Sequence, residues 1–124
     1  MITGSAGSDD LNGTQEADTI YGRGGADTID GNGAGDRLFG NTGNDTVEGG
    51  DGPDQLYGQD DNDRLFGGPS DDRLAGHYGD FLLVGGPGRT DEFYGGPGFD
   101  TCVVEGPEHA KGHQLSSCEE IVTD

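Results

Sequence analysis

The chain has too few large apolar residues for an ordinary globular core. Leucine, isoleucine, valine and phenylalanine together number 22 among 124 residues. Lysine and arginine number 6 against 25 aspartates and glutamates, which leaves a formal net charge of −19. A chain of this composition buries too little apolar surface to offset the entropy lost on folding. Something other than hydrophobic burial must therefore drive folding.

The excess of acid also excludes several classes of partner. An acidic surface repels nucleic acid and anionic membranes, whereas it attracts cations. No apolar run approaches the roughly 20 residues that span a bilayer, and no charged segment followed by an apolar stretch opens the chain. We therefore expect cations as partners, with no nucleic acid and no membrane insertion.

What the chain does have is glycine and aspartate in a strict nine-residue period. Glycine recurs every nine residues from Gly4 to Gly85, and Gly95 follows after ten. An aspartate stands five places after each of the first eight glycines, at Asp9, Asp18, Asp27, Asp36, Asp45, Asp54, Asp63 and Asp72. An apolar residue stands seven places after each of the first nine glycines, at Leu11, Ile20, Ile29, Leu38, Val47, Leu56, Leu65, Leu74 and Leu83. Low complexity alone does not hold three residue classes in one phase, so the period indicates a repeat fold.

The unit predicts a solenoid of turns and very short strands. Its glycines permit a tight six-residue bend, and the triplet after the bend points outside, inside and outside in turn. Each unit makes half a coil, so units two apart stack as parallel strands about 4.8 Å apart. The apolar residues then line two inner sheets, which take alternate units, beginning with Leu11 in one sheet and Ile20 in the other.

At these positions the sequence resembles the RTX, or hemolysin-type, calcium-binding repeat G-G-x-G-x-D-x-U-x. The resemblance covers residues 4 to 103, and the turns at 49–54 and 95–100 match the full pattern. It implies an all-β, right-handed parallel β-roll in which residues 1–103 form about eleven repeats. Residues 104–124 would then form an irregular C-terminal cap. At the fourth place glycine is replaced by Glu16, Ala34, Asp61 and Ser70. If that place needs φ > 0, Asp61 tolerates it better than Glu16 or Ala34, so the turns at Glu16 and Ala34 are expected to be looser.

The resemblance also implies how calcium is held. Each ion lies between successive turns on one side, with ligands from places two, four and six of one turn and one, three and six of the next. All but the aspartates at the sixth place contribute backbone carbonyls. On one side the implied sites combine Ser5, Gly7 and Asp9 with Gly22, Gly24 and Asp27; Arg23, Gly25 and Asp27 with Gly40, Thr42 and Asp45; and Asn41, Gly43 and Asp45 with Gly58, Asp60 and Asp63. On the other they combine Thr14, Glu16 and Asp18 with Gly31, Gly33 and Asp36; Asn32, Ala34 and Asp36 with Gly49, Asp51 and Asp54; and Gly50, Gly52 and Asp54 with Gly67, Pro69 and Asp72.

These six sites suit calcium, which takes six to eight oxygens and tolerates irregular geometry, better than magnesium, which needs a strict octahedron. Asp91 and Asp100 are further candidates. Six divalent ions would change the formal charge from −19 to −7. We therefore expect calcium binding and folding to be one event.

The pattern breaks toward the C-terminus. Phe81 takes the ligand place of the ninth unit, and an extra residue precedes Asp91, so the calcium ladder is expected to weaken there. Phe81 with residues 82–84 is expected to form an apolar closing layer. In the cap, residues 107–112 predict a short helical turn. Cys102 and Cys118 permit one disulfide in an extracellular chain, and the alternative is a zinc site at His109 and His113.

The family accompanies secreted proteases, lipases, toxins and polysaccharide epimerases, so the resemblance implies a secreted structural module that assists folding. Residues 1–3 fit the last three places of a repeat, so we expect the array to belong to a longer chain. No nucleophile motif indicates an enzyme. Outward aromatic residues leave two interpretations open, a face that binds polysaccharide or a second copy, or rings that pack on each other: Tyr21, Phe39, Tyr57 and Tyr94.

Overall fold

The computed structural model describes residues 1–86, 91–104, 114–116 and 120–123. All regular structure in these ranges is β-strand, and no helix there could span a membrane. The strands are β1 (Ile2–Thr3), β2 (Asp10–Asn12), β3 (Thr19–Tyr21), β4 (Thr28–Asp30), β5 (Arg37–Asn41), β6 (Thr46–Glu48), β7 (Gln55–Asp60), β8 (Arg64–Phe66), β9 (Arg73–Tyr78), β10 (Leu82–Val84), β11 (Glu92–Tyr94), β12 (Thr101–Val104), β13 (Gln114–Ser116) and β14 (Glu120–Thr123).

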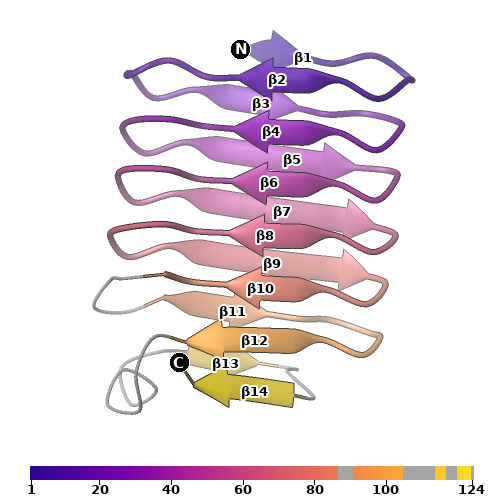
Figure 1. The fold of residues 1–124 in the computed structure, drawn as a ribbon, viewed down its shortest axis with the longest axis vertical. Coiled ribbons are helices and arrows are strands. Elements are labelled where there is room, and N and C mark those ends of the chain that lie inside the picture. The colour runs from indigo at the N-terminus through magenta and orange to yellow at the C-terminus, as the bar shows by residue number, and fades with distance from the viewer. Residues whose placement is uncertain (87–90, 105–113, 117–119, 124) are drawn as a thin grey trace.

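The strands form two parallel sheets that face each other along the whole stack (Figure 1). The odd-numbered strands make one seven-stranded sheet, the odd sheet, and the even-numbered strands make the other, the even sheet. Ile20 lies opposite Leu38 in the odd sheet, and Ile29 lies opposite Val47 in the even sheet. Two repeats therefore make one coil, and the predicted parallel β-roll is confirmed.

The core is a single apolar layer between the two sheets. The strands from β3 to β12 each bury one apolar side chain completely, and these are Ile20, Ile29, Leu38, Val47, Leu56, Leu65, Leu74, Leu83, Phe93 and Cys102. Their neighbours in each strand face outward because side chains alternate across a strand. Phe81 joins this layer from a turn. The predicted inner sheets are confirmed, and the layer is thin because each strand contributes little to it.

The segment expected to be an irregular cap extends both sheets. β13 pairs with β11, and β14 pairs with β12. Ile121 takes the register position beside Cys102, and Leu115 takes the position beside Phe93. An apolar residue therefore still takes these two register positions, although the glycine and aspartate pattern has ended. The predicted helical turn, Cys118 and the paired histidines lie outside the described residues.

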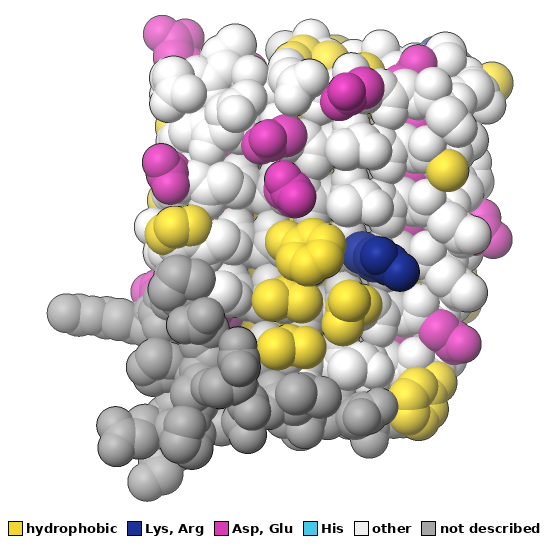
Figure 2. All heavy atoms as spheres, viewed as in Figure 1, with side chains coloured by type: hydrophobic (Ala, Val, Ile, Leu, Met, Phe, Trp, Pro, Cys, Tyr) yellow, Lys and Arg dark blue, Asp and Glu magenta, His cyan; other side chains and the backbone are white. Residues whose placement is uncertain are grey.

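The predicted closing layer at residues 81–84 is wrong. β10 is an internal strand that pairs with β8 on one side and β12 on the other. Strand alternation buries Leu83 but leaves Leu82 and Val84 on the outer face. Phe66 and Val103 flank Val84 in register, so hydrophobic side chains gather outside β8, β10 and β12 (Figure 2).

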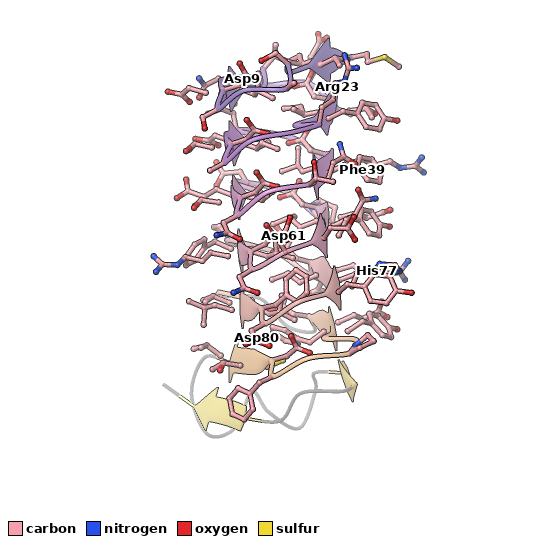
Figure 3. The ribbon with its side chains drawn as sticks, turned by 90° about the vertical axis from the view of Figure 1, so that its right-hand side faces the viewer. Asp9, Arg23, Phe39, Asp61, His77 and Asp80 are labelled. Carbon is pink, nitrogen blue, oxygen red and sulfur yellow. The ribbon has the colours of Figure 1, made fainter. Side chains whose placement is uncertain are left out.

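The outward aromatic residues of the odd sheet form a stacked column. The ring centroids of Tyr21 and Phe39 are 4.9 Å apart, as are those of Phe39 and Tyr57, with interplanar angles of 10°. Phe39 extends outward from this sheet (Figure 3). The packing interpretation is confirmed for these three residues, whose ring faces cover one another.

Candidate metal centre

Aspartates from successive turns line up in two buried columns. The Asp9 column contains Asp9, Asp27, Asp45 and Asp63, and the Asp18 column contains Asp18, Asp36, Asp54, Asp72 and Asp91. Within these columns every aspartate except the terminal Asp9 and Asp18 is at most 2% exposed. The sixth place lies two residues before the inward apolar residue, so the pleat directs both side chains to the same side. The sequence pattern therefore predicts the register of these carboxylates.

One oxygen of each internal carboxylate is fixed by the backbone of the preceding coil. The N–H of Asp27 donates to Oδ1 of Asp45 at 2.8 Å, and the N–H of Asp45 donates to Oδ1 of Asp63 at 2.7 Å. The same bond joins Asp36 to Asp54 at 2.8 Å in the other column. This bond satisfies an N–H next to a strand and holds each carboxylate in one orientation.

The second oxygen of each internal carboxylate is buried without a hydrogen bond. Oδ2 accepts none from the described residues in Asp27, Asp36, Asp45, Asp54, Asp63 and Asp72. A buried charged oxygen without a partner is costly, because it has lost its water and gained nothing in exchange. These six oxygens therefore need a partner that carries positive charge.

A backbone carbonyl oxygen converges on five of these six oxygens, all except that of Asp63. A Cβ built on Gly22 would lie 2.6 Å from Oδ2 of Asp27 and 2.7 Å from the carbonyl oxygen of Gly40. Glycine at the first place thus leaves a space that faces two oxygens, the carboxylate oxygen of its own turn and a carbonyl oxygen of the next coil. The same convergence pairs Asp9 with Gly22, Asp18 with Gly31, Asp36 with Gly49, Asp45 with Gly58, Asp54 with Gly67 and Asp72 with Gly85.

These donors fit calcium. They are oxygens, and no group of three or more His, Cys, Asp or Glu side chains that could hold a metal occurs in the described ranges. An ion here would therefore combine carboxylates with backbone carbonyls, which calcium accepts and zinc does not favour. Calcium would supply the positive charge that the buried oxygens lack. In each predicted ligand set, the structure brings together the aspartate of one turn and the first-place carbonyl of the next. Ligation by the carbonyls at the second, third and fourth places stays a prediction.

Phe81 interrupts one column but not the other. Its ring lies where a Cβ on Gly58 or Gly76 would be, so Gly58 lacks the pair of oxygens seen beside Gly40. Its N–H donates to Oδ1 of Asp100 at 3.0 Å, so the backbone pattern continues below it. In the Asp18 column, the N–H of Asp72 donates to Oδ1 of Asp91 at 2.8 Å despite the inserted residue. The expected weakening therefore applies to the Asp9 column alone.

The first two turns contain a feature that the sequence reasoning missed. The backbone N–H and hydroxyl of Ser5 donate to Oδ2 of Asp9, at 2.6 and 3.0 Å. Thr14 makes the same two bonds to Asp18. The sequence signal for these bonds is a serine or threonine four residues before the aspartate. At the open end of the columns, Oδ2 of Asp9 and of Asp18 therefore already has donors, unlike Oδ2 of the six internal aspartates named above.

Several turns use left-handed backbone at two places. Ala34, Asp61 and Ser70 at the fourth place have φ values of 64°, 75° and 91°, which confirms φ > 0 at these three residues. Glu16 at the fourth place of the second turn does not have a positive φ, so the expectation does not hold for that turn. The second place is also left-handed, with φ of 77° at Arg23 and 72° at Asn32, and this was not predicted. Asparagine tolerates this conformation better than most residues, but arginine does not, so composition alone is a weak signal.

Burial raises the pKa of the internal aspartates. Desolvation is the main cause, Coulomb repulsion from neighbouring carboxylates adds to it, and the backbone N–H bond opposes it. The pKa of Asp45 and of Asp54 rises to about 7, and that of Asp63 and of Asp72 to about 8. Without a cation, the middle of each column therefore holds protons near neutral pH.

Acidification should stabilise the calcium-free roll. A raised folded-state pKa gives a contribution to stability that is complete below the unperturbed value of 3.8 and lost as the pH rises to about 7 or 8. Chelated protein should therefore gain β-structure between pH 8 and pH 4, as measured by circular dichroism. In the roll that acid has refolded, near pH 5, these aspartates hold protons, so calcium uptake there should release them, which a pH-stat records. No release of protons from the acid-refolded roll would contradict these pKa values.

Gly22→Ala should weaken calcium binding strongly. The new Cβ would lie within 3 Å of both oxygens at that site, which include a backbone carbonyl that cannot move freely. We expect the calcium midpoint of folding to rise about tenfold or more, as for loss of more than about 1.4 kcal/mol. Gly24→Ala in the same turn is the matched control, because its nearest contact would be 3.3 Å. Equal midpoints for the two variants would place the ions elsewhere.

Comparison with known proteins agrees with this geometry. The model of the RTX calcium-binding nonapeptide repeat matches residues 3–38, 30–65, 39–74, 57–90 and 66–102. Searches of curated proteins and of solved structures found no match to the chain. The family match covers most of the sequence and includes both aspartate columns. The chain belongs to the RTX family of calcium-binding nonapeptide repeats.

Proposed function

We propose that the chain is a structural module of a larger secreted protein and that it folds when calcium fills its two turn columns. The supporting observation is the set of six buried Oδ2 atoms without hydrogen bonds in the described residues. The thin apolar layer and the charge of −19 oppose folding on their own. Calcium offsets both, because its binding energy becomes folding energy when no site exists in the unfolded chain.

The proposed number of ions is about six, one for each pair of successive aspartates in a column up to Asp72. The convergence of Asp72 with Gly85 favours a seventh. Isothermal titration calorimetry of chelated protein with calcium tests the number directly. Six or seven ions per chain are expected, with little response to magnesium. A stoichiometry of one or two ions would overturn the ladder.

A disulfide between Cys102 and Cys118 is proposed to secure the C-terminal end. Cys102 is fully buried in the last described core position of the even sheet. Closing the 102–118 loop would add about 3 kcal/mol of stability in the chain-entropy model. Cys102→Ser with Cys118→Ser should therefore raise the calcium midpoint and make the transition less cooperative. Alkylation of two thiols in unreduced, unfolded parent protein would contradict the disulfide.

A further inference from the structure

The aromatic column of the odd sheet is interrupted by one small residue. Tyr21, Phe39 and Tyr57 stack on successive strands, and Ala75 takes the next register position. Tyr94 follows on the strand after that. Ala75 is partly exposed. The column therefore lacks one ring between Tyr57 and Tyr94.

The interruption has the width of one ring. Each step of the stacked column is 4.9 Å, and Tyr57 and Tyr94 are two strand steps apart. Among the described residues, no ring stacks on Tyr57 from the Ala75 side and none stacks on Tyr94. Tyr94 is 44% exposed. A flat ring placed over Ala75 would continue the spacing of the column.

Polar side chains flank the interruption along the strand. β9 places Arg73, Ala75 and His77 on the same outer face, and Arg73 and His77 are exposed. Nε of Arg73 donates to Oε2 of Glu92 at 2.6 Å, which anchors the guanidinium to β11, the strand that also carries Tyr94. Figure 3 shows His77 on the same side of the roll as Phe39. The position over Ala75 thus has tyrosines across the strands and hydrogen-bonding groups along them.

We propose that the Ala75 notch, formed by Tyr57, Arg73, Ala75, His77 and Tyr94, binds one neutral pyranose ring of a glycan. A pyranose ring has apolar C–H faces, which suit aromatic neighbours, and hydroxyls around its edge, which suit Arg73 and His77. An anionic sugar is disfavoured, because Glu92 already neutralises Arg73 and the chain carries a charge of −19. A tyrosine from a second copy would match the width but would give Arg73 and His77 fewer hydrogen-bond partners.

This inference goes beyond the calcium-dependent module and requires only that the roll be folded. The test uses calcium-loaded full chain, with folding verified by circular dichroism, and hexasaccharides of β-1,4-linked glucose, mannose and galactose as probes. Nuclear magnetic resonance follows the Ala75 methyl and the tyrosine rings. Shifts confined to Ala75, Tyr57 and Tyr94 are expected with at least one probe. A single ring buries little surface, so the Kd should be on the order of 1 mM.

Two variants and a matched control localise the binding. Ala75→Tyr fills the notch, and Tyr94→Ala removes one of its rings, so each should weaken binding at least about tenfold. Thr3→Tyr adds a ring beside Tyr21 at the far end of the same column, and it should leave binding unchanged. Equal loss in all three variants would overturn the proposal, as would no shift with any probe. Ala75 shifts that depend on protein concentration without glycan would show that a second copy occupies the notch instead.

Discussion

Chelation of calcium should convert the protein from β-sheet to a largely disordered chain. The folded chain buries six carboxylate oxygens that lack hydrogen bonds from the described residues, and repulsion along each column raises the energy further. Only one apolar residue per strand offsets these terms. At pH 7.5, circular dichroism should show loss of the β-sheet signal in excess chelator and its recovery at millimolar calcium, the concentration that suits extracellular modules.

Magnesium is the matched control for this experiment, because it carries the same charge but needs stricter geometry and keeps its water. It should restore little β-structure at the concentration at which calcium restores all of it. Recovery with both ions would mean that charge screening alone stabilises the roll. Identical spectra in chelator and in calcium would contradict coupled folding.

Asp45→Asn should raise the calcium midpoint much more than Asp9→Asn. Asp45 is 1% exposed, its Oδ2 accepts no hydrogen bond from the described residues, and its place in the column puts it between two ion sites. Asp9 belongs to one site at the end of the column, and Ser5 already donates two hydrogen bonds to its Oδ2. Asparagine keeps the Oδ1 acceptor and removes only the charge. We expect a rise of about tenfold or more for Asp45→Asn and about threefold or less for Asp9→Asn.

Calcium titrations monitored by circular dichroism give both midpoints. Asp63→Asn is a useful third variant, because Phe81 follows Asp63 in the column and leaves it with one complete neighbouring site. Its midpoint should lie between the other two. Equal midpoints for the three variants would mean that the aspartates contribute general charge and that their position in the column has no effect.

Much of this fold follows from the nine-residue period alone. The inward position of Leu38 and the shared register of Asp36 and Asp54 follow from a side-chain period of two and a coil of two units. Glycine at the first place was predicted as a flexible turn residue. The structure gives a more specific reason for Gly22, because a Cβ there would lie 2.6 Å from the carboxylate of the same turn and 2.7 Å from the carbonyl of Gly40 in the next coil.

The remaining features depend on contacts between coils, which no single unit reveals. Phe81 takes the place of an aspartate in the repeat. Its ring can lie inside the roll because Gly58 and Gly76 have no side chain to fill that space. The strands β13 and β14 continue the sheets with apolar residues but without the glycine and aspartate that mark a repeat. The notch at Ala75 is visible only when every second unit is aligned across the odd sheet.

The central claim is that calcium lies in rows along the two aspartate columns. Anomalous diffraction from crystals grown in calcium measures the ion positions directly. The account predicts a row of peaks in each column, beside Gly22, Gly40, Gly31 and Gly49 among others, and no peak beside Gly58, where Phe81 fills the space. Peaks confined to exposed acidic residues such as Asp10 and Glu48, or an absence of peaks in a folded roll, would contradict it.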